Sequence, residues 1–372
     1  MFDFIPASLY TLIYYHFLLA VMVMLAVVLI SSSSLQDANV KTLSQTMGLA
    51  LVVLMIAYIG MRPVNFRFGD MVIYNQGYAH LQGGGTMDIT KDYLFNYFMI
   101  FCAKIMPASM FFLLIDVIYV IPCYLFSKKY FGHYWLYAFF LFIASFSFWS
   151  YGTNGLRNGM ATAVFIWGLI YYHDRKWLMY LLFTVSIGLH SSLIIPVAAF
   201  FAAGVIKNPK MFFYIWLLCI PLSIAGGGFW TNLFGSIGLG GDTRAADYLN
   251  ADAVSDLAKS EGTTFSSTGF RWDFVLYSAS AVFAGWYFIL KKKLTDQFYI
   301  RLWGTFMIAN AFWILVIRAA FSNRFAYLSW FLMAPVIIYP FVKYRFSATQ
   351  NRSLAYVIAA YYLFTYFMFL KG

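Results

Sequence analysis

Long apolar runs follow one another along almost the whole chain, and they constrain the fold more than any other feature. The first is Leu9–Ile30 and the last is Leu354–Leu370, with short polar links between most successive runs. Of the 372 residues, 62% are hydrophobic and only 10% are charged, which is not the composition of a soluble globular domain. The runs approach the length of a membrane-crossing helix and lack the alternation of membrane β-strands. The sequence therefore predicts an all-α polytopic membrane protein.

The polar links divide these runs into about twelve predicted transmembrane helices within a single transmembrane domain, residues 1–372. Tyr93–Met106 is expected to be an interfacial or re-entrant helix instead, because Lys104 and Pro107 interrupt its apolar pattern. Two polar segments, about residues 61–92 and 226–271, are predicted as outer loops. The predicted membrane helices are Leu9–Ile30, Gln45–Gly60, Pro107–Phe126, Tyr134–Trp149, Arg157–Tyr172, Trp177–Leu189, Leu193–Ile206, Met211–Ala225, Trp272–Leu290, Phe298–Ile317, Phe325–Val342 and Leu354–Leu370.

Lysine and arginine are distributed unequally between the two sides of the predicted membrane topology. Every lysine-rich link falls on one side, which the positive-inside rule identifies as cytoplasmic, so both termini are predicted to face outward. The net charge of +11 then reflects membrane orientation, and we expect no nucleic-acid partner. The other side is rich in arginine, whose guanidinium can hold a phosphate through two parallel hydrogen bonds. The seven arginines on that side are Arg62, Arg67, Arg157, Arg244, Arg271, Arg318 and Arg324.

Two interpretations of these seven arginines remain open. They could bind a phosphate-bearing or otherwise anionic ligand at the membrane edge, or they could form ion pairs with carboxylates. We expect some ion pairs and at least two ligand-binding arginines. The carboxylates available on that side are Asp70, Asp242, Asp247, Asp252, Asp256, Glu261 and Asp273.

The stretch Tyr151–Gly159 is the most informative point in the chain. This polar turn leads directly into an apolar run, which places Arg157 near the end of a membrane helix. A charge at that depth is costly unless it faces water, a partner or an anion. Gly155 and Gly159 give the helix start a small face that another backbone or a ligand could approach. The next run ends at His190 on the same predicted side, so Arg157 and His190 are candidate neighbours. The alternative is an arginine extended to the interface and a hydrogen-bonded core histidine.

No motif for nucleotide or metal chemistry stands out. There is no P-loop and no zincin helix, and the glycines near Gly238 follow no strand. The three cysteines lie in apolar runs without metal-ligand spacing. The remaining candidates are His190 or Asp70 as a catalytic base, with the arginines as an anion-binding group. Asp116 lies well inside an apolar run, and either a functional role or a packing role is open for this carboxylate.

Four short motifs, in order along the chain, resemble those of the EpsG-type, Wzy-like polysaccharide polymerases. Arg62, followed by Gly69, Asp70 and Tyr74, resembles the family's "R…G-D-x-x-x-Y" loop. The segment Gly155–Ala161, which contains Arg157, resembles the family's "G-x-R-x-x-x-A" helix start.

The other two motifs lie later in the chain. His190 with Ser192 resembles the family's "H-x-S" step one helix further on, and Asn323 with Arg324 is similar to its late outward arginine. The resemblance covers roughly residues 62–344, with the motifs in the family's order.

The resemblance implies a glycosyltransferase of the bacterial cytoplasmic membrane, with its active site facing the periplasm or exterior. It would move a growing glycan from a polyprenyl-pyrophosphate carrier onto a new lipid-linked repeat unit, without nucleotide, metal or other cofactor. The product would be an O-antigen, a capsule or an exopolysaccharide. The implied partners are the lipid-linked donor and acceptor, membrane lipid, and in some systems a chain-length regulator protein. The implied catalytic residues are His190 and Asp70, and the implied substrate-binding residues are Arg62, Arg67, Tyr74, Arg157, Asn158, Ser191, Arg271, Arg318 and Arg324.

Two other function classes compete with this one. A transporter or flippase of lipid-linked glycans would also be polytopic with ionisable groups in the membrane, but the sequence lacks the paired repeats and matched broken helices of many transporters. An acyltransferase would use His190 as its base.

Overall fold

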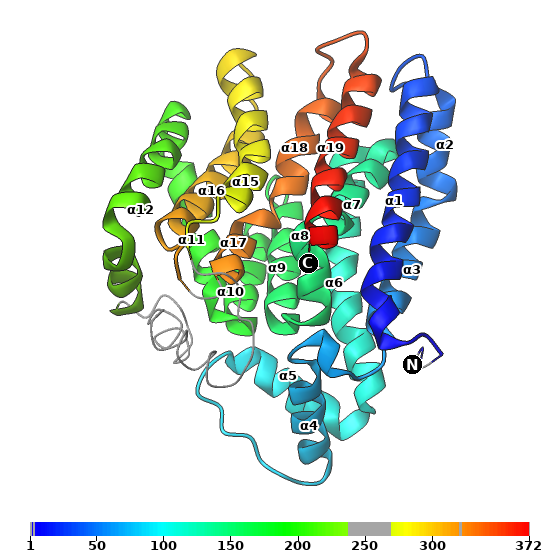
Figure 1. The fold of residues 1–372 in the computed structure, drawn as a ribbon, viewed down its shortest axis with the longest axis vertical. Helices are drawn as coiled ribbons and strands as arrows, with labels where there is room; N and C mark the ends of the chain where they lie inside the picture. Colours follow the sequence, from blue (N-terminus) through cyan, green and yellow to red (C-terminus); the bar gives the residue numbers. More distant parts are fainter. Residues whose placement is uncertain (1, 3, 237–268, 320–321, 372) are drawn as a thin grey trace. The chain divides into compact units, whose positions relative to one another are not determined.

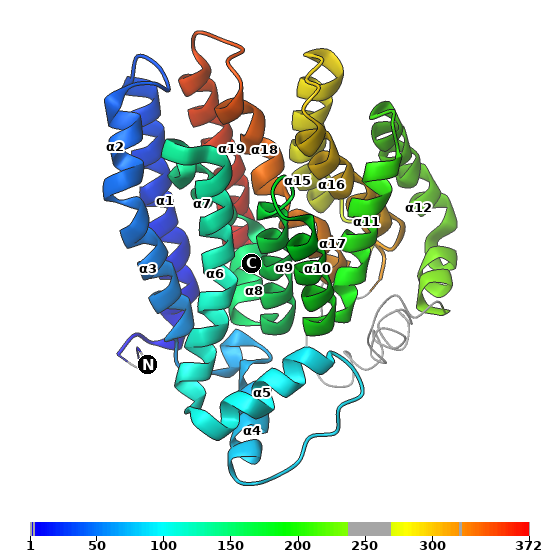
Figure 2. The ribbon, with the colours of Figure 1, turned by 180° about the vertical axis from the view of Figure 1, so that it is seen from behind.

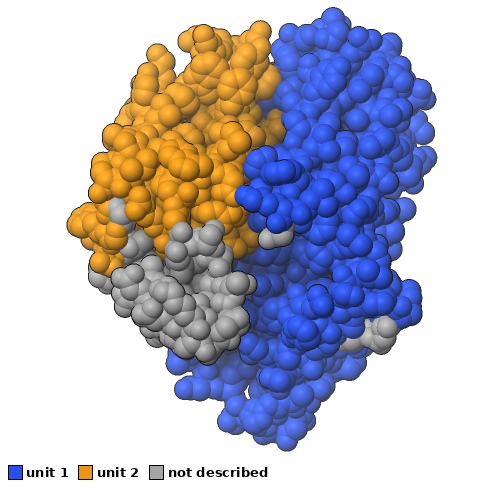
Figure 3. All heavy atoms as spheres, in the orientation of Figure 1, with its two compact units in different colours: residues 1–191, 338–372 blue, residues 192–337 orange. Residues whose placement is uncertain are grey.

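The computed structural model describes residues 2, 4–236, 269–319 and 322–371 of the chain. All regular secondary structure in these residues is helical (Figure 1). They form two compact units, and Figure 3 shows residues 1–191 with 338–372 as unit 1 and residues 192–337 as unit 2. Most of the predicted outer loop at 226–271, including Arg244, lies outside the described residues. The prediction of one transmembrane domain stays a prediction, and each unit is described by itself.

Unit 1 is built around α6, which packs against α3 on one side and α9 on another. α9 in turn packs against α8 and α10, and α10 packs against α5. The elements of unit 1 are α1 (Ala7–Ser31), α2 (Ala38–Thr46), α3 (Gly48–Gly60), η1 (Phe66–Phe68), α4 (Met71–Gln82), α5 (Tyr93–Ile105), α6 (Ala108–Phe131), η2 (Gly132–Tyr134), α7 (Trp135–Ile143), α8 (Phe146–Thr153), α9 (Leu156–Ile170), α10 (Lys176–Leu189) and α19 (Gln350–Lys371).

Unit 2 is centred on α16, which packs against α11, α12, α15 and α17. Asn310 of α16 joins three of these helices, because its amide accepts from Trp216 Nε1 at 2.7 Å and donates to Ser278 Oγ and Ser329 Oγ. The elements of unit 2 are η3 (Ser191–Leu193), α11 (Ile194–Val205), α12 (Lys210–Ser236), α15 (Trp272–Gly285), the π-helical turn η4 (Trp286–Lys291), α16 (Gln297–Leu315), α17 (Ser322–Trp330) and α18 (Met333–Lys343), with the unit boundaries falling inside η3 and α18.

The helices are consistent with a polytopic membrane protein. Among the described residues, seven helices are long and apolar enough to cross a membrane, or eight if the bent pair Lys210–Gly226 and Gly228–Phe234 forms one span. Four more apolar helices are shorter, at 10–17 residues. The count of twelve spans therefore stays a prediction. One predicted span, Tyr134–Trp149, forms two helices, α7 and α8, because the backbone is extended at Ser145.

The links predicted on the lysine-rich side come together at one end of unit 1. Lys129, at the end of α6, lies 2.5 Å from Asp174 in the α9–α10 link. Asn351 of α19 donates to the carbonyl of Ser32 at the end of α1. The start of α1, with α4 and α5, lies at the opposite end of the unit in both views (Figures 1 and 2). Within unit 1, these links and the start of α1 thus lie at opposite ends, and their assignment to the two sides of a membrane stays a prediction.

Candidate functional site

Arg157 lies in the first turn of α9, directly after the short link that separates α8 from α9. Its Nε donates to the hydroxyl of Tyr74 at 2.8 Å, and its Nη1 donates to Asp92 Oδ2 at 2.8 Å. The guanidinium carbon lies 5.8 Å from the ring centroid of Tyr74 and 5.9 Å from that of Phe95. The side chain is still 26% exposed. A guanidinium that is held in place on a partly exposed side chain can meet an anion without first being ordered.

Asp92 connects three helix ends at this point. It precedes α5, but its carboxylate does not cap that helix. Oδ2 accepts from Arg157, and Oδ1 accepts from the backbone N–H of Ser191 at 2.9 Å, directly after α10. The backbone of Asp92 is left-handed, with φ of 49°, which aspartate and asparagine tolerate better than most residues. One almost fully buried carboxylate thus fixes the starts of α5 and α9 and the end of α10.

Three predicted residues lie beside this contact. His190 ends α10, is half-buried, and immediately precedes Ser191. Asn158 follows Arg157 on α9. Asn158 Oδ1 and Ser191 Oγ are buried and have no hydrogen-bond partner among the described residues. Buried polar atoms are nearly always paired. Asn158 Oδ1 is therefore available to accept a hydrogen bond from a bound ligand, and Ser191 Oγ is available to donate or accept one.

Asp70 joins the same cluster from the start of α4. Its backbone N–H donates to Asn154 Oδ1 at 2.9 Å, which ties α4 to the α8–α9 link. This approach requires Gly69, because its φ is 61° and a Cβ there would lie 2.3 Å from Asn154 Oδ1. Burial raises the pKa of the Tyr74 hydroxyl; the charge of Arg157 opposes this shift and that of Asp70 adds to it. Tyr74 therefore stays protonated at neutral pH and can still accept from Arg157.

Arg62 is fully buried next to Thr153, the last residue of α8. Its side chain has no exposed surface, and its Nη1 lies 3.0 Å from Asp116 Oδ2. The same guanidinium donates to the carbonyl of Ile59 and, at 3.1 Å, to the carbonyl of Thr153. The substrate-binding role predicted for Arg62 stays a prediction, and the lack of exposed surface on its side chain argues against direct contact with a substrate. Arg62 holds the link that carries Arg157, and Asp116 is its buried counterion.

The family model for EpsG matches residues 45–371 of this chain. The chain belongs to the EpsG family. It is accordingly a polysaccharide-polymerase-like membrane protein. No curated protein and no solved structure matches the chain.

The EpsG-type motifs of unit 1 meet in one place. Arg157 of the second motif donates to Tyr74 of the first motif and to Asp92. Asp92 in turn accepts from Ser191, which lies at the end of α10 within the third motif. The close approach predicted for Gly159 is also present, since a Cβ there would lie 2.7 Å from the Tyr151 carbonyl oxygen of α8.

The other predicted substrate-binding arginines are Arg67 in unit 1 and three residues of unit 2. Arg67 is exposed on η1. Arg271 lies before α15 and pairs with Asp273, with Nη2 2.8 Å from Oδ2, as the ion-pair interpretation predicted. Arg318 is exposed in the link after α16, and Arg324 is exposed in the first turn of α17. The last three belong to unit 2, so their roles at the Arg157 cluster stay predictions.

Sequence reasoning missed two residues that organise the site, Asp92 and Asn154. A signal for Asp92 was present, since it is the last polar residue before the aromatic run of α5. That position predicts a helix cap, not a counterion for a residue 65 positions away. In the described part of the chain, no group of three His, Cys, Asp or Glu side chains lies close enough to hold a metal ion.

Proposed function

We propose that this EpsG-family protein is a glycosyltransferase that polymerises polyprenyl-pyrophosphate-linked repeat units at the outer leaflet of the bacterial cytoplasmic membrane. The observation that carries the proposal is the partly exposed Arg157 side chain, whose guanidinium is held by Asp92 and Tyr74 next to the end of α10. Two candidate bases, His190 and Asp70, flank this cluster. This arrangement supports the proposal, because Arg157 would bind an anion beside two side chains that can take a proton from a sugar hydroxyl.

In the proposed reaction, the acceptor hydroxyl attacks the anomeric carbon of the donor glycan. The bond from that carbon to the pyrophosphate oxygen breaks as the new glycosidic bond forms, and the proton of the hydroxyl passes to the base. The polyprenyl pyrophosphate leaves with the electron pair. Arg157 stabilises the charge that develops on its oxygens, because a preorganised cation acts most strongly where charge appears in the transition state.

The other predicted residues have secondary roles in this proposal. Asn158 and Ser191 contact polar groups of the donor. Arg67, Arg271, Arg318 and Arg324 attract or hold its phosphates, and a chain-length regulator protein is a proposed partner.

The identity of the base can be tested directly. We favour His190, with Asp70 as the group that binds the acceptor, because His190 lies next to the Ser191 backbone that Asp92 holds in place. The measurement is the in vitro polymerisation rate against pH for the parent, His190→Gln and Asp70→Asn. If His190→Gln keeps near-parent rates at every pH, His190 is only structural and Asp70 becomes the base.

The function itself is tested by the glycans of a strain that lacks this protein. We expect single lipid-linked repeat units at the outer leaflet and no long chains on a gel of extracted glycans. The alternative function, a flippase, predicts that repeat units stay on the cytoplasmic leaflet. Accessibility of the repeat units to an external glycan-modifying enzyme separates the two outcomes.

A further inference from the structure

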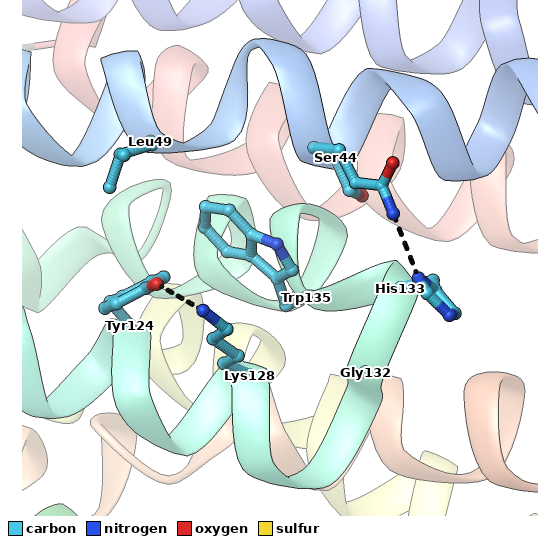
Figure 4. A pocket seen from close by; sticks show the side chains of 8 residues that line it. Ser44, Leu49, Tyr124, Lys128, Gly132, His133 and Trp135 are labelled. Carbon is cyan, nitrogen blue, oxygen red and sulfur yellow. Dashed lines mark hydrogen bonds between the residues drawn. The ribbon is translucent and has the colours of Figure 1, made fainter.

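A cavity lies at the lysine-rich end of unit 1. It has a volume of about 520 Å³ and lies between α2–α3 and the end of α6 with η2 (Figure 4). Lys128 and Tyr124 of α6 form one wall, and Ser44, Gln45 and Leu49 form the other. Nothing in the proposed polymerase reaction uses this cavity.

One part of the cavity is built from hydrogen-bonding groups and a cation. Lys128 Nζ donates to the hydroxyl of Tyr124 at 3.0 Å, and Gln45 Nε2 lies 3.3 Å from His133 Nδ1. Ser44 Oγ is fully buried and has no hydrogen-bond partner among the described residues. No carboxylate lines the cavity. These groups therefore favour an anion with several acceptor oxygens.

The other part of the cavity is apolar. The indole of Trp135 lies against α3, because a Cβ added to Gly48 would lie 2.4 Å from the indole ring. The ring centroids of Trp135 and Tyr124 are 4.9 Å apart. Leu49 is 56% exposed on the same helix pair, Ala38–Gly60, that is long and apolar enough to cross a membrane. If this helix pair crosses the membrane, its exposed leucine contacts acyl chains. The cavity therefore joins a cationic end to a surface that contacts acyl chains.

We propose that this cavity binds the phosphate-bearing headgroup of an anionic phospholipid. Lys128 contacts the phosphate, Ser44 and Gln45 contribute hydrogen bonds, and the acyl chains lie along Trp135 and Leu49. A zwitterionic headgroup binds less well, because its own cation is repelled by Lys128. The proposal does not depend on the polymerase reaction.

The neighbouring lysine supplies a matched control. Lys129 carries the same charge one residue away, but it pairs with Asp174 at 2.5 Å and does not line the cavity. The measurement is the thermal unfolding of the full-length protein in neutral detergent, titrated with phosphatidylglycerol, phosphatidylcholine or inorganic phosphate. The variants are the parent, Lys128→Gln and Lys129→Gln.

We expect phosphatidylglycerol to raise the melting temperature of the parent and of Lys129→Gln at the same concentration. Lys128→Gln should need about tenfold more lipid for half of the shift, the loss expected for one charge-assisted hydrogen bond. Equal losses in the two variants would indicate diffuse surface charge and overturn the proposal. So would the absence of any shift with phosphatidylglycerol, an equal shift with phosphatidylcholine, or a shift with inorganic phosphate that matches the lipid.

Discussion

The described part of unit 1 contains two arginine–aspartate pairs with the same chemistry in different surroundings. The side chains of Arg62 and Asp116 are 0% and 1% exposed, with their charged atoms 3.0 Å apart. Arg157 and Asp92 lie 2.8 Å apart, and Asp92 is 2% exposed, but Arg157 is 26% exposed. The first pair is fully buried, whereas the second leaves part of the arginine side chain exposed. The difference shows that an arginine near a membrane helix end is not by itself a ligand site, because its exposure decides which role is open to it.

The two pairs also act on the same short link. Arg62 donates to the Thr153 carbonyl just before the α8–α9 link, and Arg157 lies just after it. The buried pair therefore helps to set the position of the accessible one. This dependence gives four ways to test the comparison, in order of expected effect.

The largest effect should come from Arg62→Ala. This change leaves the Asp116 carboxylate buried without its counterion, which costs about 3–5 kcal/mol of folding free energy. We expect little folded protein in the membrane and a much lower melting temperature in detergent. The double variant Arg62→Met with Asp116→Leu removes both charges and should recover much of that stability. If Arg62→Ala alone melts like the parent, the pair does not hold the fold.

Arg157→Lys should leave the fold intact but strongly reduce activity. Lysine keeps the charge but loses the planar fork that contacts Tyr74 and Asp92 together. We expect polymerisation to fall about a hundredfold, nearly as far as in Arg157→Ala, at an unchanged level of inserted protein. The measurement is in vitro polymerisation per mole of purified enzyme. Good rescue by lysine would mean that only a general positive charge is needed there.

Asp92→Asn should have a smaller effect, of about tenfold, corresponding to about 1.4 kcal/mol. Asparagine tolerates the left-handed backbone and can still accept a hydrogen bond, but it lacks the charge that orients Arg157. As a positioning residue, Asp92 should affect kcat more than the KM for the lipid-linked donor. A purely structural role predicts instead less folded enzyme with an unchanged kcat per folded molecule.

The smallest effect should come from Tyr74→Phe. The ring that lies beside Arg157 is kept, and only the hydroxyl that accepts from Nε is removed. One lost hydrogen bond at a partly solvated site predicts a decrease in rate of roughly three- to tenfold. Ala at this position removes the ring as well, so it should be clearly worse than Phe. Equal rates for Tyr74→Phe and the parent would show that Asp92 alone orients the guanidinium.

Most of the helical framework was predictable from the sequence, because apolar runs and their polar links report it locally. The predicted interfacial helix Tyr93–Met106 is α5, Tyr93–Ile105, and the predicted span Trp177–Leu189 is α10, Lys176–Leu189. The break at Ser145 was not predicted, since serine within an aromatic run gives no clear stop signal. The number of membrane spans could not be predicted from the apolar runs alone, because four of the apolar helices are only 10–17 residues long.

The candidate site was predictable only in part. The spacing of the runs predicted that Arg157 and His190 would lie at the same end of two neighbouring helices. In the structure α9 packs against α10. Arg157 is hydrogen-bonded to Asp92, which also accepts from the backbone of Ser191, the residue after His190. The counterions were not predictable, because Asp92 lies 65 residues from Arg157 and Asp116 lies 54 residues from Arg62. Such pairings depend on tertiary packing, which no local pattern in one sequence specifies.

The lengths of α9 and α10 have a consequence for where the reaction would take place. The two helices contain 15 and 14 residues, so each is only about 21–23 Å long, whereas the hydrocarbon core of a bilayer is about 30 Å thick. If the Lys129–Asp174 end of unit 1 lies level with one membrane surface, Arg157 and His190 lie roughly 7–9 Å below the other. The bilayer would have to thin, or water would have to enter, around that depression. A lipid-linked pyrophosphate could then reach Arg157 while its carrier chain remained in the membrane.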